Sequence, residues 1–320
     1  MEYAKLGRTD LNISKIGFGG TGIADMYHMH TQDEATNAVL KALDLGINYF
    51  DASPRYGPEG QAETRLGIAL EGHRNDIVLA TKCGCYDHGK PCAQVLEYDY
   101  SAKRVRAEIE NSLRRLRTDY VDIYQVHDVQ NAASLTQILE ETLPELEKLR
   151  DEGKIRYIGV TGYKLEALRW LVERFPGLDM VLNFACYNLV DTTLDGYFDD
   201  LRASRGLGVV NSSILYVGML TMSIATLSHH KAEDKHVEFK KAIRKCIDIC
   251  NERGLDLGEV AVTFGTHCPT AESTIIATGN PSRLAKNVEL FERPVDVELC
   301  KEFHEILKGH SMFAPEPLKI

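Results

Sequence analysis

Ile47-Asn-Tyr-Phe-Asp-Ala-Ser-Pro-Arg-Tyr-Gly57 is the stretch of sequence that decides the fold of this chain. Residues 47–50 are apolar and aromatic, which is typical of a short buried strand. Asp51 follows immediately, and a carboxylate at the end of a buried strand needs a partner or a function. Pro54 and Gly57 predict a turn, and this turn carries Tyr56. One strand end therefore presents an acid and a phenol a few residues apart.

Two further predicted strands also end in ionisable residues. Residues 77–82 end in a lysine, and residues 120–127 end in a histidine. A phenol donates a proton poorly near neutral pH because its ordinary pKa is about 10, but a neighbouring cation lowers that pKa. Lys82 supplies such a cation. The sequence therefore predicts one proton-transfer site composed of Asp51, Tyr56, Lys82 and His127.

Eight predicted strands alternate with helices along the chain, which favours parallel βα units. The strands are expected at residues 16–20, 47–50, 77–82, 120–127, 155–162, 180–186, 208–213 and 274–279. Eight such units fit one (β/α)₈ TIM barrel over residues 1–320, with its site at the carboxyl ends of the strands. The alternative is a doubly wound open sheet, which usually carries a glycine-rich phosphate turn near its start. Gly17, Gly19, Gly20 and Gly22 lack that spacing.

Other segments are expected to surround the barrel. Residues 3–13 predict an N-terminal β-hairpin, and the first helix is expected to begin after Thr31 and to end at Leu45. Residues 83–100 and 216–234 are expected to be loops, the second containing His229 and His230. The remaining helices, including extra ones at the C-terminus, are expected at 61–70, 101–116, 135–152, 165–174, 194–204, 237–253, 257–266, 282–290 and 297–307.

Composition excludes several classes of function. The chain has 320 residues, of which 44% are hydrophobic, and its net charge is −10, so a basic nucleic-acid or membrane surface is not expected. The sequence contains no apolar run long enough for a membrane span and no apolar signal core near Met1. Its eight cysteines are expected to be reduced thiols of a cytoplasmic monomer or weak homo-oligomer. No compact Cys/His quartet predicts a metal site, although Cys83, Cys85 and Cys92 cluster.

Four motifs in this order and spacing resemble the aldo-keto reductase family. They are Leu-Gly-Arg-Thr-Asp-Leu at 6–11, Asn-Tyr-Phe-Asp-Ala-Ser-Pro-Arg-Tyr-Gly at 48–57, Ser-Leu-Arg-Arg-Leu-Arg-Thr-Asp-Tyr-Val-Asp-Ile at 112–123, and Gly-Lys-Ile-Arg-Tyr-Ile-Gly-Val-Thr-Gly at 153–162. The resemblance implies a barrel oxidoreductase that uses a nicotinamide cofactor without a Rossmann domain. It implies that Tyr56 transfers the proton, that Lys82 paired with Asp51 lowers the pKa of Tyr56, and that His127 orients the substrate oxygen.

The resemblance also implies a path for the cofactor along the second half of the barrel. Thr161 and Asn183 would lie near the carboxamide, with Gly162 beside them; Ser213, Leu215 and Gly218 would follow the pyrophosphate; Thr278, Gly279, Arg283, Lys286 and Asn287 would meet the adenosine end. Many members have an aromatic residue where this chain has Ser212. NADPH-preferring members often have a lysine where this chain has Ala277, so NAD is expected over NADP, although Arg283 can still supply a charge.

Two stretches are similar to aldose dehydrogenases of the L-galactose and L-fucose type: Glu-Tyr-Asp-Tyr-Ser-Ala-Lys-Arg-Val at 97–105 and Val-His-Asp at 126–128. These enzymes oxidise the anomeric carbon of a free sugar, such as L-galactose, L-fucose or D-arabinose, to a lactone. The expected substrate contacts are Tyr56, His127, Asp128 and Tyr86, with Asp87 and His88 nearby in the loop. Two alternatives stay open: an NADPH-dependent reductase of aldehydes or ketones, and a non-catalytic subunit that binds the cofactor.

Overall fold

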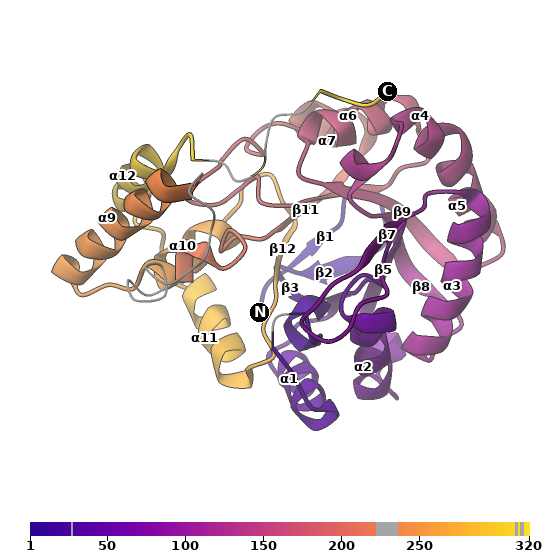
Figure 1. Cartoon of the computed structure of the whole chain (residues 1–320), viewed down its shortest axis with the longest axis horizontal. Coiled ribbons are helices and arrows are strands. Elements are labelled where there is room, and N and C mark those ends of the chain that lie inside the picture. The colour runs from indigo at the N-terminus through magenta and orange to yellow at the C-terminus, as the bar shows by residue number, and fades with distance from the viewer. Residues whose placement is uncertain (27, 222–235, 311–312, 314–316) are drawn as a thin grey trace.

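A closed parallel barrel is the centre of the molecule. The computed structural model describes residues 1–26, 28–221, 236–310, 313 and 317–320. The barrel strands are β3 Ile16–Gly19, β4 Tyr49–Asp51, β5 Val78–Cys83, β8 Val121–Val126, β9 Ile155–Gly162, β10 Met180–Asn183, β11 Gly208–Ser212 and β12 Ser273–Ile276. Each pairs with the next along the chain, and β12 pairs with β3 to close the ring (Figure 1). This confirms the predicted (β/α)₈ barrel.

Helices lie outside the strands, as the alternating pattern predicts (Figure 1). In the described part of the chain they are α1 Gln32–Asp44, α2 Gln61–Ala69, α3 Ala102–Leu116, α4 Leu135–Gln137, α5 Leu143–Asp151, α6 Leu165–Arg174, α7 Asp199–Arg205, α9 Val237–Arg253, α10 Leu257–Thr266, α11 Pro281–Phe291 and α12 Val297–Leu307. Thr31 caps α1 reciprocally with Glu34, which confirms that start of the helix. The extra C-terminal helices α9 and α12 pack together through an apolar cluster of their own, including Phe239, Ile243 and Phe303.

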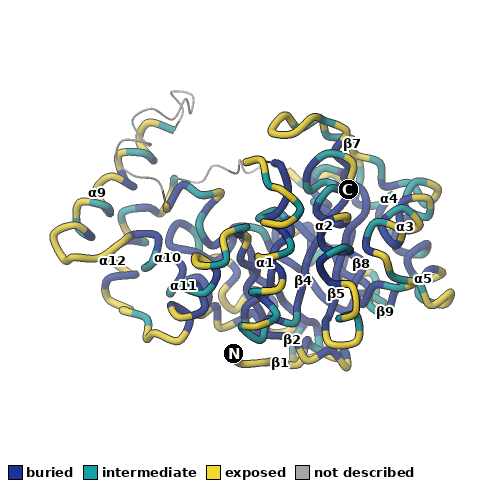
Figure 2. The backbone as a smooth tube through the Cα atoms, turned by 90° about the horizontal axis from the view of Figure 1, so that it is seen from below, coloured by how far each residue is buried: buried dark blue, intermediate teal, exposed yellow. Residues whose placement is uncertain are grey.

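The predicted N-terminal hairpin closes the end of the barrel that lies opposite the strand carboxyl ends. Its strands are β1 Tyr3–Lys5 and β2 Asn12–Ser14, paired antiparallel. Leu6, Leu11 and Ile13 are buried in one cluster with side chains from inside the barrel, such as Tyr49 and Met180. Figure 2 shows this hairpin at the bottom of the molecule and β7 at the top. The open end of the barrel is therefore the end where the predicted site residues lie.

Three segments differ from the sequence-based expectation. The loop expected at 83–100 contains a second hairpin, β6 Cys85–Asp87 paired with β7 Leu96–Tyr98. The single helix expected at 135–152 is interrupted by a π-helical segment, Ile138–Thr142, because Pro144 near the start of α5 has no N–H to donate to the preceding turn. The helix expected at 194–204 begins only at Asp199, since Gly196 has a φ of 69°.

The described residues contain no helix long and apolar enough to cross a membrane. They also contain no group of three His, Cys, Asp or Glu side chains arranged to hold a metal ion. All eight cysteines are free thiols, and of these only Cys92 is exposed. His229 and His230 lie outside the described residues.

Candidate active site

The end of β4 and the end of β5 are joined by a buried ion pair. The Lys82 ammonium donates to the carboxylate of Asp51 and to the carbonyl oxygen of Ala52, the latter at 2.8 Å. The second oxygen of Asp51 accepts a hydrogen bond from Nε2 of Gln125 on β8, at 2.9 Å. Asp51 and Lys82 are 2% and 1% exposed. Buried charges are tolerated only when they are paired and hydrogen-bonded, so this network fixes both side chains in place.

Tyr56 and His127 lie directly beside this ion pair. The Lys82 nitrogen is 4.9 Å from the centroid of the Tyr56 ring. The rings of Tyr56 and His127 meet edge to face, with centroids 5.6 Å apart and an angle of 89° between their planes. The structure thus brings the four predicted residues to one place at the open end of the barrel: Asp51 on β4, Tyr56 in the turn after it, Lys82 on β5 and His127 directly after β8.

The electrostatics keep the phenol protonated and the imidazole neutral. Burial raises the pKa of Tyr56 well above 10, the Asp51 carboxylate raises it further, and the Arg55 guanidinium lowers it. The predicted lowering of the Tyr56 pKa by Lys82 is therefore not found: the net shift is upward, and burial is its largest cause. Burial lowers the pKa of His127 well below 6.5, and Lys82 and Arg55 lower it further. His127 is therefore uncharged at neutral pH.

The hydroxyl of Ser53 lies within hydrogen-bonding distance of one ring nitrogen of His127. Ser53 Oγ is 3.0 Å from Nδ1 of His127 and accepts a hydrogen bond from the backbone N–H of Arg55 at 3.1 Å. The hydroxyl proton is available for Nδ1. When Ser53 donates this proton, a neutral His127 carries its own proton on Nε2, which can then donate to a substrate oxygen.

Asp128 follows His127 at the rim of the site. Its backbone is left-handed, with a φ of 49°, and its N–H donates to the Thr161 hydroxyl at 3.0 Å. One carboxylate oxygen lies 3.9 Å from Nε2 of His127, which is beyond hydrogen-bonding distance. Burial raises the pKa of Asp128, and Arg55 opposes that rise. The structure therefore places Asp128 beside the imidazole.

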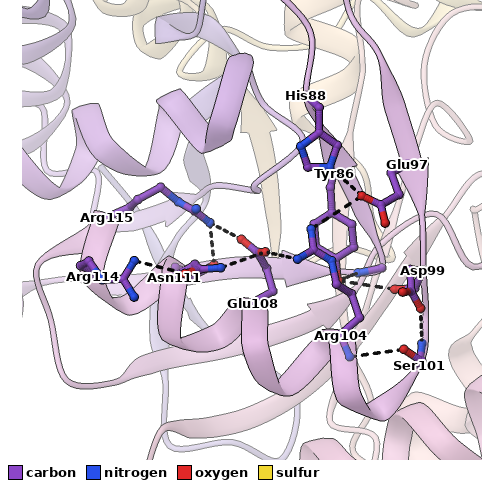
Figure 3. A network of polar contacts seen from close by, with 12 residues as sticks. Tyr86, His88, Glu97, Asp99, Ser101, Arg104, Glu108, Asn111, Arg114 and Arg115 are labelled. Atoms are coloured by element: carbon purple, nitrogen blue, oxygen red, sulfur yellow. Dashed lines mark hydrogen bonds and ion pairs between the residues drawn. The ribbon is translucent and has the colours of Figure 1, made fainter.

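Tyr86 lies at the base of the β6–β7 hairpin. Its hydroxyl accepts a hydrogen bond from the Gly84 N–H at 3.0 Å, and the guanidinium of Arg104 lies over its ring, 4.1 Å from the centroid. Figure 3 shows how Arg104 on α3 also reaches Glu97 of β7 and Glu108 of its own helix. Tyr86 thus anchors the hairpin to α3, and its contact with a substrate stays a prediction.

The other two loop residues named from the sequence also have structural partners. Oδ1 of Asp87 accepts from the N–H groups of Gly89 and Val95, at 2.8 and 3.0 Å, and so closes the hairpin. His88 is exposed and bonded to Glu97 at 2.6 Å. Both side chains therefore shape the hairpin that stands at the open end of the barrel.

The predicted carboxamide contacts lie at the ends of β9 and β10. Thr161 and Gly162 are buried, and the Thr161 hydroxyl is used by Asp128. The amide of Asn183 donates to Val210 O and Asn211 Oδ1, at 3.0 and 3.2 Å, and its oxygen accepts from the N–H of Cys186. Asn183 therefore links β10 to β11 in this structure, and its contact with a cofactor stays a prediction.

The loop predicted to follow the pyrophosphate has an unusual backbone. Ser213, Tyr216, Val217 and Gly218 have φ values of 59°, 48°, 57° and 83°. Successive backbone N–H groups in such turns can form an anion-binding nest, although the N–H groups of Tyr216 and Val217 donate to Ser213 here. A Cβ atom at Gly218 would meet nothing within 4 Å, so Gly218 faces open space. Leu215, in contrast, packs against the apolar core.

The predicted adenosine end lies at the start of α11. Asn280 caps this helix by accepting the N–H of Arg283 at 3.0 Å, and Thr278 accepts the N–H of Asn280. Gly279 lies against the carbonyl of Gly22. A helix N-terminus attracts phosphate through its unpaired N–H groups and its dipole.

The three remaining side chains predicted for the adenosine end lie within α11. Arg283 is exposed and has no side-chain partner among the described residues, whereas Lys286 pairs with Glu259 and Glu289. Asn287 is buried. Arg283 is therefore the cation that remains available to a ligand at this end.

A model of the Aldo/keto reductase family matches residues 15–308. The chain belongs to this family. Aldo/keto reductases are oxidoreductases that bind nicotinamide cofactors. The backbone of the 213–218 loop and the start of α11, with Arg283 beside it, suit the phosphates of such a dinucleotide.

Individual relatives of this aldo/keto reductase include aldose dehydrogenases. L-galactose dehydrogenase of Arabidopsis thaliana is 35% identical over 317 residues, covering 96% of this chain and 95% of the relative. D-arabinose 1-dehydrogenase of Saccharomyces cerevisiae is 30% identical over 262 residues, covering 79% and 75%. Among solved structures, an aldo-keto reductase of Bacillus halodurans in its holo form matches with a TM-score of 0.74 and 25% identity, covering 96% of each chain.

Sequence reasoning missed three residues of the site. Gln125 bonds to Asp51, Ser53 contacts His127, and Arg55 influences both Tyr56 and His127 electrostatically. A signal existed for two of them, because Ser53 and Arg55 belong to the 47–57 stretch itself. Gln125 offered a weaker signal: it is a polar residue inside an otherwise apolar strand, two positions before His127.

Proposed function

We propose that this aldo/keto reductase oxidises C1 of a free aldose to its lactone with NAD. The observation that carries the proposal is the assembly of Asp51, Tyr56, Lys82 and His127 beside a polar rim formed by Asp128 and the β6–β7 hairpin. The similarity to L-galactose dehydrogenase and D-arabinose 1-dehydrogenase supports the substrate class.

Each residue of the site has a distinct role in this proposal. Tyr56 accepts the proton of the C1 hydroxyl in oxidation and donates it in the reverse direction. The Nε2–H of neutral His127 donates to the reacting oxygen and so orients it. Asp51 and Lys82 form a fixed ion pair beside the Tyr56 ring and hold the surroundings of the phenol in place. The nicotinamide, when bound, accepts the hydride.

The second candidate is reduction of aldehydes or ketones, and one specific observation favours it. Burial raises the pKa of Tyr56, which keeps the phenol in the form that donates a proton. Oxidation needs the phenolate, so the rate of oxidation is expected to rise with pH, while reduction is served by the phenol throughout the neutral range. The assembly of Asp51, Tyr56, Lys82 and His127 argues against the third alternative, a non-catalytic subunit that only binds the cofactor.

The preference for NAD is part of the proposal. Ala277 is exposed beside the start of α11 and offers no charge to a 2′-phosphate. Arg283 is the remaining cation, and a single charged hydrogen bond contributes about 1.5–3 kcal/mol. We therefore infer that both dinucleotides bind and that NAD is favoured. The proposed setting is a cytoplasmic monomer or weak homo-oligomer formed by one barrel domain over residues 1–320.

A substrate screen followed by nicotinamide absorbance tests the proposed function. L-galactose, L-fucose and D-arabinose with NAD are compared with simple aldehydes and NADPH, at several pH values. The expected result is kcat/KM at least about tenfold higher for one of the sugars, increasing with pH. Faster turnover of simple aldehydes with NADPH would favour the second candidate instead.

A further inference from the structure

Arg55 is a charged residue of the site to which neither the family resemblance nor the reaction assigns a role. It directly precedes Tyr56 in the turn after β4, and its backbone N–H is held by the Ser53 hydroxyl that also contacts His127. The backbone of Arg55 is therefore fixed next to Tyr56 and, through Ser53, next to His127, the two residues proposed to contact the substrate oxygen. The side chain is partly buried at the open end of the barrel.

The Arg55 guanidinium lacks the partners that other enclosed arginines have. Within 4.0 Å it meets no carboxylate oxygen of the described residues, and its buried Nε–H has no hydrogen-bond acceptor among them. The Nε–H groups of Arg104 and Arg202 also lack an acceptor, but their guanidinium groups pair with Glu108 and Glu272, at 3.4 and 2.9 Å. A buried donor without an acceptor costs free energy, so this Nε–H is suited to a ligand.

Asp128 is the charged group with the largest effect on the pKa of Arg55. Burial lowers that pKa and the Asp128 carboxylate raises it, although the two side chains form no direct ion pair. One oxygen of Asp128 is at the same time 3.9 Å from Nε2 of His127. A donor in the turn that carries Tyr56 and an acceptor beside His127 are therefore both present at the site without satisfying each other.

The charges of the site nearly cancel, which favours a ligand without a net charge. Lys82 balances Asp51, Arg55 balances Asp128, and His127 is neutral. An anionic group would meet Asp128, and a cationic group would meet Arg55. A hydroxyl both donates and accepts, so it fits between a guanidinium and a carboxylate.

The β6–β7 hairpin lies beside the turn that carries Arg55, because β6 contacts the Pro58–Gly60 segment that follows this turn. Cys85 and Tyr98 face each other across the hairpin. Arg104 fixes the hairpin to α3 through Tyr86 and Glu97 (Figure 3). The hairpin next to Arg55 is therefore held in a fixed position on α3.

We propose that Arg55 and Asp128 together bind a hydroxyl on the carbon next to the reacting one, and so select neutral polyhydroxylated substrates over simple carbonyls and over anionic ones. Arg55 donates to this hydroxyl, and Asp128 accepts its proton in a hydrogen bond. This inference rests on the proposed function for its substrate class.

The test compares three small aldehydes reduced by the wild-type enzyme with its dinucleotide at pH 7: glyceraldehyde, which has the neighbouring hydroxyl; propanal, which lacks it; and glyoxylate, which is anionic. In Arg55→Met, the ratio of kcat/KM for glyceraldehyde to that for propanal is expected to fall about 10- to 100-fold, because charged hydrogen bonds are lost. Arg55→Lys should recover part of the ratio, and Asp128→Asn should lower it. Arg174→Met, on the far side of α6, is the matched control and should leave the ratio unchanged.

Several outcomes would overturn the inference. These are an unchanged glyceraldehyde-to-propanal ratio in Arg55→Met, a preference of the wild type for glyoxylate that Arg55→Met abolishes, or no turnover of any of the three aldehydes. Melting temperatures identify a variant that fails to fold, in which case Arg55→Lys and Asp128→Asn carry the test. If the ratio falls as expected while no aldose is oxidised, the proposed function fails and the role of Arg55 stands.

Discussion

The two halves of the barrel rim are built in different ways. On the side of β4, β5 and β8, the chemistry depends on side chains fixed by named partners, such as Asp51 between Lys82 and Gln125. On the side of β9 to β12, the polar side chains of Thr161 and Asn183 bond to neighbouring protein groups. The cofactor path proposed on that side instead follows a loop that contains left-handed residues and the start of α11.

Because of this difference, we expect substitutions in the two halves to affect activity in different ways. Proton transfer needs one particular atom, so a single substitution removes it. In the proposed binding mode, many backbone groups share the dinucleotide, so a change in one side chain shifts the preference between NAD and NADP without abolishing binding. The substitutions below test this contrast.

The largest effect is expected for Tyr56→Phe. Removal of the hydroxyl that transfers the proton should lower kcat by about 10²- to 10⁴-fold while the protein stays folded. Steady-state kinetics and circular dichroism measure the two properties. Tyr3→Phe, which removes an exposed hydroxyl at the closed end of the barrel, is the control and should retain activity. Retained activity in Tyr56→Phe would mean that another group transfers the proton.

The next effect is on stability, for Lys82→Met. This change leaves the Asp51 carboxylate buried without its cation, which should cost about 3–5 kcal/mol in the free energy of unfolding. Adding Asp51→Asn should restore part of that loss, because the uncompensated charge is removed. Chemical denaturation measures both variants, with Lys241→Met at an exposed ion pair as a near-neutral control. Equal stabilities of the single and the double variant would contradict this account.

The smallest effect is expected on the cofactor side, for Ala277→Lys. A lysine here should raise the NADP-to-NAD ratio of kcat/KM about tenfold, because it adds a charge for the 2′-phosphate. Ala277→Met has similar bulk without the charge and should leave the ratio unchanged. A large preference of the wild type for NADP would refute the proposed preference for NAD. It would show that Arg283 alone is sufficient to bind the 2′-phosphate.

Much of the fold and of the candidate site could be predicted because it depends on residue order. The carboxyl ends of parallel strands meet at one face, so Asp51, Lys82 and His127 could be placed together before their contacts were known. Helix starts such as Thr31 were also predictable, because a cap depends on a few adjacent residues.

The rest depends on contacts between distant residues. Gln125 is polar within a buried strand, and only the barrel geometry shows that it reaches Asp51. Tyr86 is predicted to meet a sugar, and that contact stays a prediction. The hairpin that turns its hydroxyl towards Gly84 was not predicted, because its strands are short and give little periodic signal. A lowering of the Tyr56 pKa by Lys82 was predicted, whereas burial raises that pKa, and the sequence does not show how deeply the ring is enclosed.

The attachment of the β6–β7 hairpin has a consequence for how relatives of this enzyme diverge. It is held to α3 by the guanidinium of Arg104, which contacts Tyr86, Glu97 and Glu108. These contacts are separate from the ion pair of Asp51 and Lys82, so changes in the hairpin can alter the choice of substrate while the proposed proton-transfer residues stay in place.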